Sequence, residues 1–187
     1  MIVHVLSFRE KPPKDIPVIN TTTRSDTWSR NLSPMLVGPV QANGVTCLNV
    51  ENAWQFSKVY KDQVDEDDNP TDAYIEWRDD GYKDSWAHRY PKGKGNIPLY
   101  SWWDENKLGY IEARKKIYIP LYGNAVKPTE TFQRLVDEYQ KYGELVLQDF
   151  DAYDHRKLGM GWKAVVNNPD RKMGHAFVLA LMLEGII

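Results

Sequence analysis

Apolar residues recur at helical spacing along several stretches of this chain, and they predict most of its secondary structure. The clearest helix covers residues 49–60. Its positions Val50, Ala53 and Trp54 follow the i, i+3, i+4 rule and share one face. Asn49 can cap this helix, because its side-chain oxygen can accept a hydrogen bond from an unpaired N–H of the first turn.

Further helices are expected around residues 73–78, over residues 105–119 and 129–142, and from Asn168 to about Leu183. Pro120 should kink or end the second of these, because proline has no N–H to donate. Gly143 is suited to end the third, since glycine readily adopts the left-handed conformation that often follows a helix. Pro169 is favourable at the first position of the last helix.

Strands are expected at residues 2–8 and 144–148, which are rich in residues that favour extended structure. Asn43 and Gly44 predict a hairpin turn. The prolines and threonines of residues 9–27 predict a long surface connection. Helices outweigh strands in this pattern, so the expected fold class is mainly α (α+β), with a few short strands.

The chain length of 187 residues suits a single compact helical domain, because one domain usually has about 100–200 residues. Within residues 1–187, the segment 62–104 is the least regular and is expected to be an insertion or a variable region. The acidic run Asp62–Asp72 lacks the glycine and the ligand spacing of a calcium loop, so it predicts a solvated loop.

Composition narrows the classes of protein. The net charge of −2 lacks the basic surplus of a protein that coats a nucleic-acid duplex, although a site for one nucleotide stays compatible with it. The single cysteine, Cys47, allows no internal disulfide and is expected to be buried, which fits a reducing cytosol. No signal peptide is expected from the first residues, and the longest apolar run, Ala176–Leu183, is too short to span a bilayer. We therefore expect a cytoplasmic protein without a membrane partner.

A second face of the helix at residues 49–60 carries Glu51, Gln55 and Lys58 in a row. The positive end of the helix dipole stabilises a carboxylate at Glu51 by about 0.3–1 kcal/mol. Such an acid could stabilise positive charge that develops on a bound substrate. A solvated polar face is the plainer interpretation of the same pattern.

Two loops contain side chains suited to binding phosphate or ribose. Arg30, Asn31 and Ser33 precede a Ser-Pro turn. Arg89 and Lys92 belong to a basic loop whose glycines allow the backbone to approach a phosphate, although the Walker spacing is absent. An ordinary turn and an ordinary flexible loop are the alternatives.

Two later residues require an explanation. Arg114 falls on the apolar stripe of the helix predicted at 105–119, where a guanidinium needs an acid or a ligand, and a structural ion pair is the preferred explanation. His175 is either a core histidine or a polar group that reaches a pocket. Gly174 costs about 1 kcal/mol in a helix relative to alanine, so it should permit a close approach by backbone or ligand.

Three carboxylates and a histidine follow the strand at 144–148 within seven residues: Asp149, Asp151, Asp154 and His155. Acids that follow a buried strand are often held at the edge of a cleft. Asp151 and Asp154 are the candidates for general acid and base, and Trp162 is a candidate platform for stacking a base. The histidines form no ligand-spaced cluster, so neither a metal nor a cofactor is expected.

These groups together suit the cleavage of an N-glycosidic bond. That reaction passes through an oxocarbenium-like transition state, which needs a negative charge near the sugar and a proton for the leaving base. A protein that binds or sequesters a nucleotide without turnover would use the same pocket. A structural or host-interaction protein with an aromatic surface is the third hypothesis.

The order of these motifs resembles the NADAR superfamily. The similar segments are Asn31-Leu32-Ser33, Val50-Glu51-Asn52-Ala53-Trp54-Gln55 with Lys58, an acid followed by Gly159-x-Gly161-Trp162, and Met173-Gly174-His175 before an apolar helix. The resemblance implies a mostly helical N-glycosidase that acts on ribosylated substrates, such as ADP-ribosylated guanine and ribosylamino-pyrimidine intermediates. The implied partner is a nucleotide or an ADP-ribosylated base, either free or within DNA or RNA.

The resemblance places the family's acidic residue on Glu51 and its late acid on Asp151 or Asp154. Asn52 stands where the family has histidine, and residues 62–104 have no counterpart. The chain therefore looks like a divergent branch found in phages and bacteria, and a phage-encoded copy would reside in the host cytoplasm. The candidates for substrate binding are Arg30, Asn31, Ser33, Trp54, Gln55, Lys58, Arg89, Lys92, Arg114, Trp162 and His175.

Overall fold

The computed structural model describes all residues from 1 to 187. Its elements in chain order are β1 (Ile2–Ser7), β2 (Val18–Asn20), a 3₁₀ helix (Trp28–Leu32), β3 (Val40–Ala42), β4 (Val45–Cys47), α1 (Val50–Phe56), β5 (Lys58–Val59), a 3₁₀ turn (Lys61–Gln63), α2 (Asp72–Lys83), β6 (Tyr100–Trp103), β7 (Asn106–Leu108), α3 (Tyr110–Ala113), a π-helical turn (Arg114–Tyr118), α4 (Ile119–Val126), α5 (Glu130–Tyr142), β8 (Glu144–Asp149), α6 (Trp162–Asn167) and α7 (His175–Leu183).

The fold is an α/β mixture, with 39% of the residues in helices and 17% in strands. The strands form three small sheets, with the orders β1-β8-β2, β3-β4 and β5-β6-β7. The expectation of a mainly α fold is therefore wrong. Several strands are only two or three residues long, so their sequences are too short to show the alternation that predicts a strand.

The sheet β1-β8-β2 is entirely parallel, and β8 lies between β1 and β2. Leu145, Val146 and Leu147 of β8 are fully buried, as expected for a parallel strand that is covered on both faces. The carboxyl ends of the three strands meet at one edge of the sheet. In open α/β sheets this edge is where ligands usually bind.

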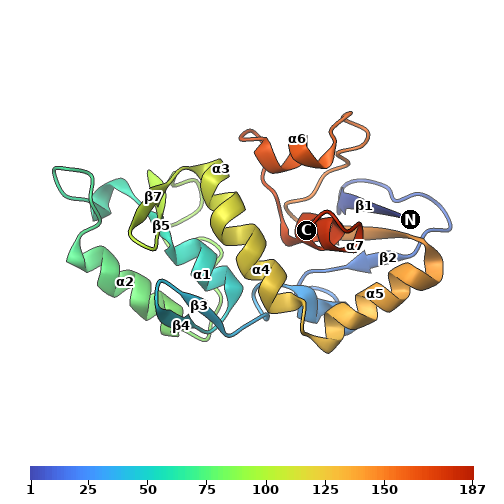
Figure 1. Cartoon of the computed structure of the whole chain (residues 1–187), viewed down its shortest axis with the longest axis horizontal. Coiled ribbons are helices and arrows are strands. Elements are labelled where there is room, and N and C mark those ends of the chain that lie inside the picture. The colour runs from blue at the N-terminus through green and yellow to red at the C-terminus, as the bar shows by residue number, and fades with distance from the viewer.

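The elements form two halves, joined by the long run from α3 through α4 (Figure 1). One half contains α1, α2 and the two antiparallel sheets, and the other contains the parallel sheet with α5, α6 and α7. One continuous cluster of buried apolar side chains includes members from both halves, such as Val50 of α1 and Val3 of β1. None of the helices combines the length and the apolar character needed to cross a bilayer.

Several predicted elements are confirmed. The strands at 2–8 and 144–148 correspond to β1 and β8, and Asn43-Gly44 connects the hairpin β3–β4. Helix α5 begins after the N-cap Thr129 and ends at Gly143, whose φ of 70° is left-handed. Cys47 is buried, as expected.

Other predicted boundaries are wrong. Helix α1 ends at Phe56, because Lys58–Val59 pairs with β6 as strand β5. The helix predicted at 105–119 starts only after β7 and continues to Val126. Pro120 does not end it, because it lies in the first turn of α4 and directly follows the wider π-helical turn.

The last helix and α2 also differ from expectation. Helix α7 starts at His175 rather than at Pro169, because Asn168 instead accepts a hydrogen bond from the N–H of Asp170 and closes a local turn. Helix α2 is twelve residues long and therefore exceeds the short helix predicted at 73–78. The connection at 9–27 contains strand β2.

Residues 62–104 pack tightly on α1. The Tyr74 hydroxyl lies 3.1 Å from the carbonyl oxygens of both Phe56 and Ser57 and donates to them. Gly81 of α2 faces the Phe56 ring so closely that a Cβ atom would lie 2.2 Å from two ring carbons. The segment is therefore part of the core packing rather than an appended loop.

Substituting Gly81 by Ala should destabilise the fold by about 1–3 kcal/mol, because the buried Phe56 ring would have to move. Gly123→Ala is the matched control, since Gly123 also lies in a helix but a Cβ there would make only ordinary contacts, with the Met182 sulfur at 3.7 Å and Val178 Cγ1 at 3.9 Å. The control should gain up to about 1 kcal/mol from its better helix propensity. Thermal unfolding of both variants checks this; equal midpoints would contradict the packing argument.

Candidate active site

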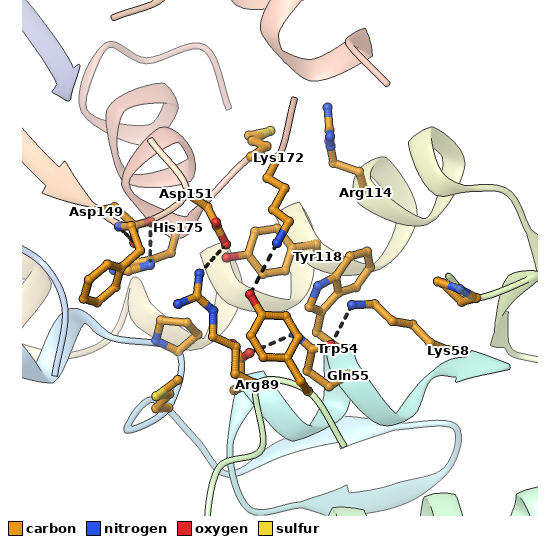
Figure 2. A pocket seen from close by; sticks show the side chains of 18 of the residues that line it. Trp54, Gln55, Lys58, Arg89, Arg114, Tyr118, Asp149, Asp151, Lys172 and His175 are labelled. Atoms are coloured by element: carbon orange, nitrogen blue, oxygen red, sulfur yellow. Dashed lines mark hydrogen bonds and ion pairs between the residues drawn. The ribbon is translucent and has the colours of Figure 1, made fainter. Parts of the chain in front are cut away.

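A cavity of about 550 Å³ opens between the two halves, at the carboxyl edge of the parallel sheet (Figure 2). Five regions that are distant in the sequence form its walls: the segment after β2, the segment after β8, helix α1, the loop between α2 and β6, and the start of α7. The π-helical turn adds Arg114 and Tyr118. Figure 2 shows the labelled side chains converging on this space.

Glu51, Gln55 and Lys58 form a hydrogen-bonded row along one wall. Gln55 Nε2 donates to Glu51 Oε1 at 2.9 Å, and Lys58 Nζ donates to Gln55 Oε1 at 2.7 Å. Glu51 is only 7% exposed, so the interpretation as a solvated face is wrong. Its Oε2 makes no hydrogen bond within the protein, which leaves this oxygen for a ligand or a water molecule.

Burial shifts the pKa of both charged ends of this row. Burial raises the pKa of Glu51 above its ordinary value of 4.5, opposed by the hydrogen bond from Gln55 and the charge of Lys58. Burial lowers the pKa of Lys58 from 10.5 to about 8, opposed by the charge of Glu51. Glu51 is therefore a stronger base than a free carboxylate, as proton transfer near neutral pH requires.

An aromatic wall adjoins the row. The Trp54 ring lies 5.1 Å from the Tyr118 ring, centroid to centroid, and Lys58 Nζ lies 4.7 Å from the Trp54 ring. The π-helical turn brings Tyr118 to this position, and such turns are frequent at functional sites. The wall offers aromatic faces against which a planar base could stack.

A buried ion pair joins the end of β8 to the start of α7. Nδ1 of His175 lies 3.1 Å from Oδ2 of Asp149, and both side chains are less than a tenth exposed. Nε2 of His175 donates to the Thr21 carbonyl oxygen at 2.8 Å, because a carbonyl can only accept. With both ring nitrogens donating, the imidazole carries a positive charge.

The pKa shifts of the pair agree with this charge state. Burial acts to lower the pKa of His175, but the Asp149 carboxylate, the Thr21 carbonyl and Glu51 together raise that pKa above 6.5. Burial acts to raise the pKa of Asp149, but His175 and the N–H groups of Phe150 and Ala176 together lower that pKa below 3.8. His175 is therefore both a buried histidine and a residue that lines the cavity.

Gly174 allows this pair to form. A Cβ at Gly174 would lie 2.0 Å from Oδ2 of Asp149, so only glycine leaves room for the carboxylate. The same carboxylate accepts hydrogen bonds from the N–H groups of Phe150 and Ala176, at 2.6 and 3.4 Å. Gly174 therefore permits a close approach, but to the Asp149 side chain first and to the Asp151 backbone second, and it does so as the N-cap of α7 rather than inside the helix, as was expected.

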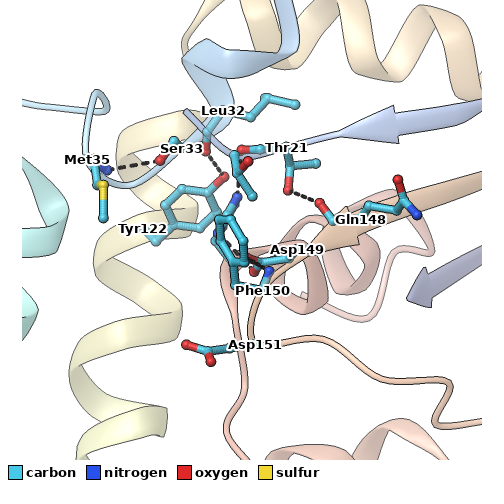
Figure 3. A network of polar contacts seen from close by, with 12 residues as sticks. Thr21, Leu32, Ser33, Met35, Tyr122, Gln148, Asp149, Phe150 and Asp151 are labelled. Carbon is cyan, nitrogen blue, oxygen red and sulfur yellow. Dashed lines mark hydrogen bonds and ion pairs between the residues drawn. The ribbon is translucent and has the colours of Figure 1, made fainter. Parts of the chain in front are cut away.

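Polar contacts hold the neighbouring strand ends in place (Figure 3). The Thr21 hydroxyl donates to the Gln148 carbonyl at 2.9 Å and ties β2 to β8. The Tyr122 hydroxyl donates to the Leu32 carbonyl at 2.5 Å and ties α4 to the segment that leads to Ser33. Ser33 lines the cavity, as predicted.

Asp151 and Arg89 form an ion pair across the cavity. Arg89 Nη2 lies 2.9 Å from Asp151 Oδ2, and each side chain is 32% exposed. Nearby, Lys172 Nζ donates to the Tyr90 hydroxyl at 3.3 Å. Arg89 and Asp151 were predicted as site residues. No sequence pattern distinguished Tyr90 or Lys172 from ordinary surface residues.

Arg114 is buried without an acidic partner, so the predicted ion pair is absent. Its guanidinium instead donates to four backbone carbonyls, those of Val165, Val166, Asn168 and Arg171, at 2.9–3.1 Å. These carbonyls lie at the end of α6 and just beyond it. Arg114 therefore fixes the segment that leads to Lys172, and one side of it lines the cavity.

Three of the predicted phosphate-binding side chains lie elsewhere. Arg30 and Asn31 are exposed on the 3₁₀ helix at 28–32 and do not line the cavity. Lys92 does not line it either, because its amine pairs with Asp62 on the outer side of the loop. Adjacency to Ser33 or Arg89 in the sequence therefore did not bring these side chains into the site.

Asp154 and Trp162 also lie outside the cavity. The Asp154 carboxylate accepts the N–H of Lys157 in a local turn. The Trp162 ring packs at a tilt against the His155 ring, with 4.3 Å between the centroids, and its Nε1 donates to Glu184. Asp151 is therefore the late acid that faces the cavity.

No group of three or more His, Cys, Asp or Glu side chains is arranged to hold a metal ion. Comparisons of the chain with protein-family models, with curated proteins and with solved structures found no match. The function must therefore be argued from the site itself.

Substituting His175 by Gln should cost about 3 kcal/mol or more of stability at pH 5.5, because Asp149 would stay buried without its cation. His175 binds its proton more tightly in the folded state, so its contribution is complete below pH 6.5 and is lost as the pH rises through the higher folded-state pKa. The difference between wild type and variant should therefore shrink between pH 5.5 and 9.

Chemical denaturation across this pH range measures the difference. His4→Gln is the control, because His4 pairs with Glu144 nearer the surface and should contribute no more than about 1 kcal/mol. A His175→Gln deficit that is the same at both ends of the pH range would contradict the charged state of His175.

Proposed function

We propose that the protein is an N-glycosidase that hydrolyses the bond between ribose and base in a ribosylated nucleotide or base, of the ADP-ribosylated guanine class. The observation that carries the proposal is the convergence of two carboxyl groups on one cavity. Glu51 and Asp151 each have one oxygen without a hydrogen-bond partner in the protein. The third acid, Asp149, is neutralised by His175.

The chemistry assigns different roles to the two acids. Glycosidic cleavage builds positive charge on the sugar, and a nearby carboxylate stabilises that charge or orients the attacking water. Glu51 suits this role, because burial raises its pKa and makes it a better proton acceptor. Asp151 on the opposite wall would, in its protonated form, donate its proton to the leaving base, and Glu51 would accept the proton of the attacking water.

Binding would use the rest of the lining. Trp54 and Tyr118 would hold the base through stacking. Arg89 and Lys172 would bind phosphate, since charged donors form the strongest hydrogen bonds to phosphate oxygens. The likeness of the segment from Val50 to Lys58 to the NADAR superfamily supports the same assignment.

A second candidate is a protein that binds and sequesters a nucleotide without hydrolysing it. The ion pair between Arg89 and Asp151 favours this candidate, because it occupies one oxygen of the acid that would serve the leaving base. The lining for ring and phosphate would be the same. Turnover separates the two candidates.

The test is a mass-spectrometric turnover assay with ADP-ribosylated guanine DNA, NAD, ADP-ribose and ribosylamino-pyrimidine phosphates. Wild type should release a free sugar phosphate or ADP-ribose from one of them. Glu51→Gln should lower kcat by about 100- to 10,000-fold with little change in KM, because it removes charge without changing shape. Asp154→Asn should retain activity, because Asp154 lies outside the cavity.

Activity that survives Glu51→Gln would contradict the assignment of Glu51. Absence of turnover with an intact nucleotide retained after hours of incubation would replace the proposal by the binding function. Circular dichroism and thermal unfolding of each variant serve as controls for folding.

A further inference from the structure

The loop between α2 and β6, residues 84–99, forms one side of the cavity. It has no regular secondary structure, and it contributes Arg89, Tyr90 and Ile97 among other lining residues. It belongs to the segment 62–104. The loop therefore adds a charged side chain, Arg89, and an aromatic side chain, Tyr90, to those that the helices bring to the site.

Asn52 holds the base of this loop. Its side-chain amide lies 2.9–3.1 Å from the carbonyl oxygens of Gly81, Asp84 and Trp86 and donates to them, and its Oδ1 accepts the N–H of His88. The residue is fully buried. Its neighbour on α1, Glu51, faces the cavity, so one turn of helix supports both the acid and the loop.

The residues that follow this held base reach the opposite wall. Arg89 pairs with Asp151 at 2.9 Å, and its guanidinium carbon lies 5.4 Å from the Phe150 ring (Figure 2). Tyr90 accepts a hydrogen bond from Lys172. These two contacts link the loop to the segments after β8 and before α7.

The ion pair is well placed for exchange with a ligand. Arg89 and Asp151 are each 32% exposed and line the open cavity. Ion pairs at this degree of exposure contribute little free energy, because water solvates both partners. The pyrophosphate of ADP-ribose carries two negative charges against the one of a carboxylate, and it can accept two parallel hydrogen bonds from a guanidinium, so it competes well for the arginine.

We propose that Arg89 selects phosphorylated ligands by exchanging its bond to Asp151 for a bond to the ligand's phosphate. The inference rests on the proposed function, which assigns the cavity to a ribosyl ligand with phosphate. The exchange frees Oδ2 of Asp151 to meet the leaving base. A ligand without phosphate leaves Oδ2 of Asp151 paired with Arg89, so this oxygen does not reach the leaving base of such a ligand. Arg89 is a specificity-determining and positioning residue in this scheme.

A double-mutant cycle with binding as the readout tests the exchange. Calorimetry measures the affinity of ADP-ribose, with adenosine as the probe without phosphate, for wild type, Arg89→Gln, Asp151→Asn and the double variant. Arg89→Gln should weaken ADP-ribose about tenfold or more and leave adenosine unchanged. Asp151→Asn should strengthen ADP-ribose about two- to fivefold, because it releases the arginine.

The gain from Asp151→Asn should disappear in the Arg89→Gln background, since the acid acts through the arginine. Asp170→Asn is the charge-matched control, because Asp170 lies close in sequence to Lys172 but its carboxylate makes no hydrogen bond or ion pair in the protein. It should leave the affinity for ADP-ribose within twofold of wild type.

Three results would overturn the inference: an equal gain from Asp151→Asn in both backgrounds, a loss from Asp151→Asn, or no measurable binding of ADP-ribose. These outcomes are separate from those of the turnover assay. A protein that shows the expected cycle but cleaves no substrate would retain the exchange and lose the glycosidase assignment. A protein that cleaves substrate but does not show the expected double-mutant cycle would retain the glycosidase assignment and lose the exchange.

Discussion

The buried ion pair between Asp149 and His175 is the interaction on which the site depends. It joins the end of the central strand β8 to the first residue of α7, at the edge of the sheet where the cavity opens. A second contact, from His175 to the Thr21 carbonyl, joins the end of β2 to the pair. Because Gly174 has no side chain, the Asp149 carboxylate can lie directly against the start of α7. This fixed edge sets the position of Asp151, two residues further on.

Helix α1 supplies the second half of the site. Glu51 and Asn52 are adjacent, and their side chains leave the helix in different directions, one into the cavity and one into the base of the loop at 84–99. The loop then carries Arg89 across to Asp151. The acid on the helix and the acid on the sheet edge are therefore coupled through a segment that also packs on α1. Residues 62–104 are therefore held at both sides, by Asn52 of α1 and by Asp151 after β8, and they form part of the core rather than an appended loop.

The sequence predicted elements best where local chemistry dominates. Asn49, Thr129 and Gly143 mark helix ends through backbone hydrogen bonds within a few residues, and β8 is a continuous apolar run. The predictions from sequence failed where contacts with residues far away in the chain determine the element. Strand β5 is defined by its pairing with β6, and the start of α7 is defined by Asp149. The fold class was misjudged for the same reason, because strands of two or three residues are stabilised by their neighbours rather than by their own pattern.

For the site, the sequence by itself determined that Glu51 and Gln55 share one helix face, because they are four residues apart on α1. Lys58 was predicted on the same helix, but it joins the row from strand β5. The sequence also placed acids after β8. Only the tertiary structure decided which of these face the cavity, that Arg114 binds backbone carbonyls rather than an acid, and that Arg89 meets Asp151. The physical reason is that helix periodicity acts within a few residues, whereas burial and charge pairing depend on which segments the folded chain brings together.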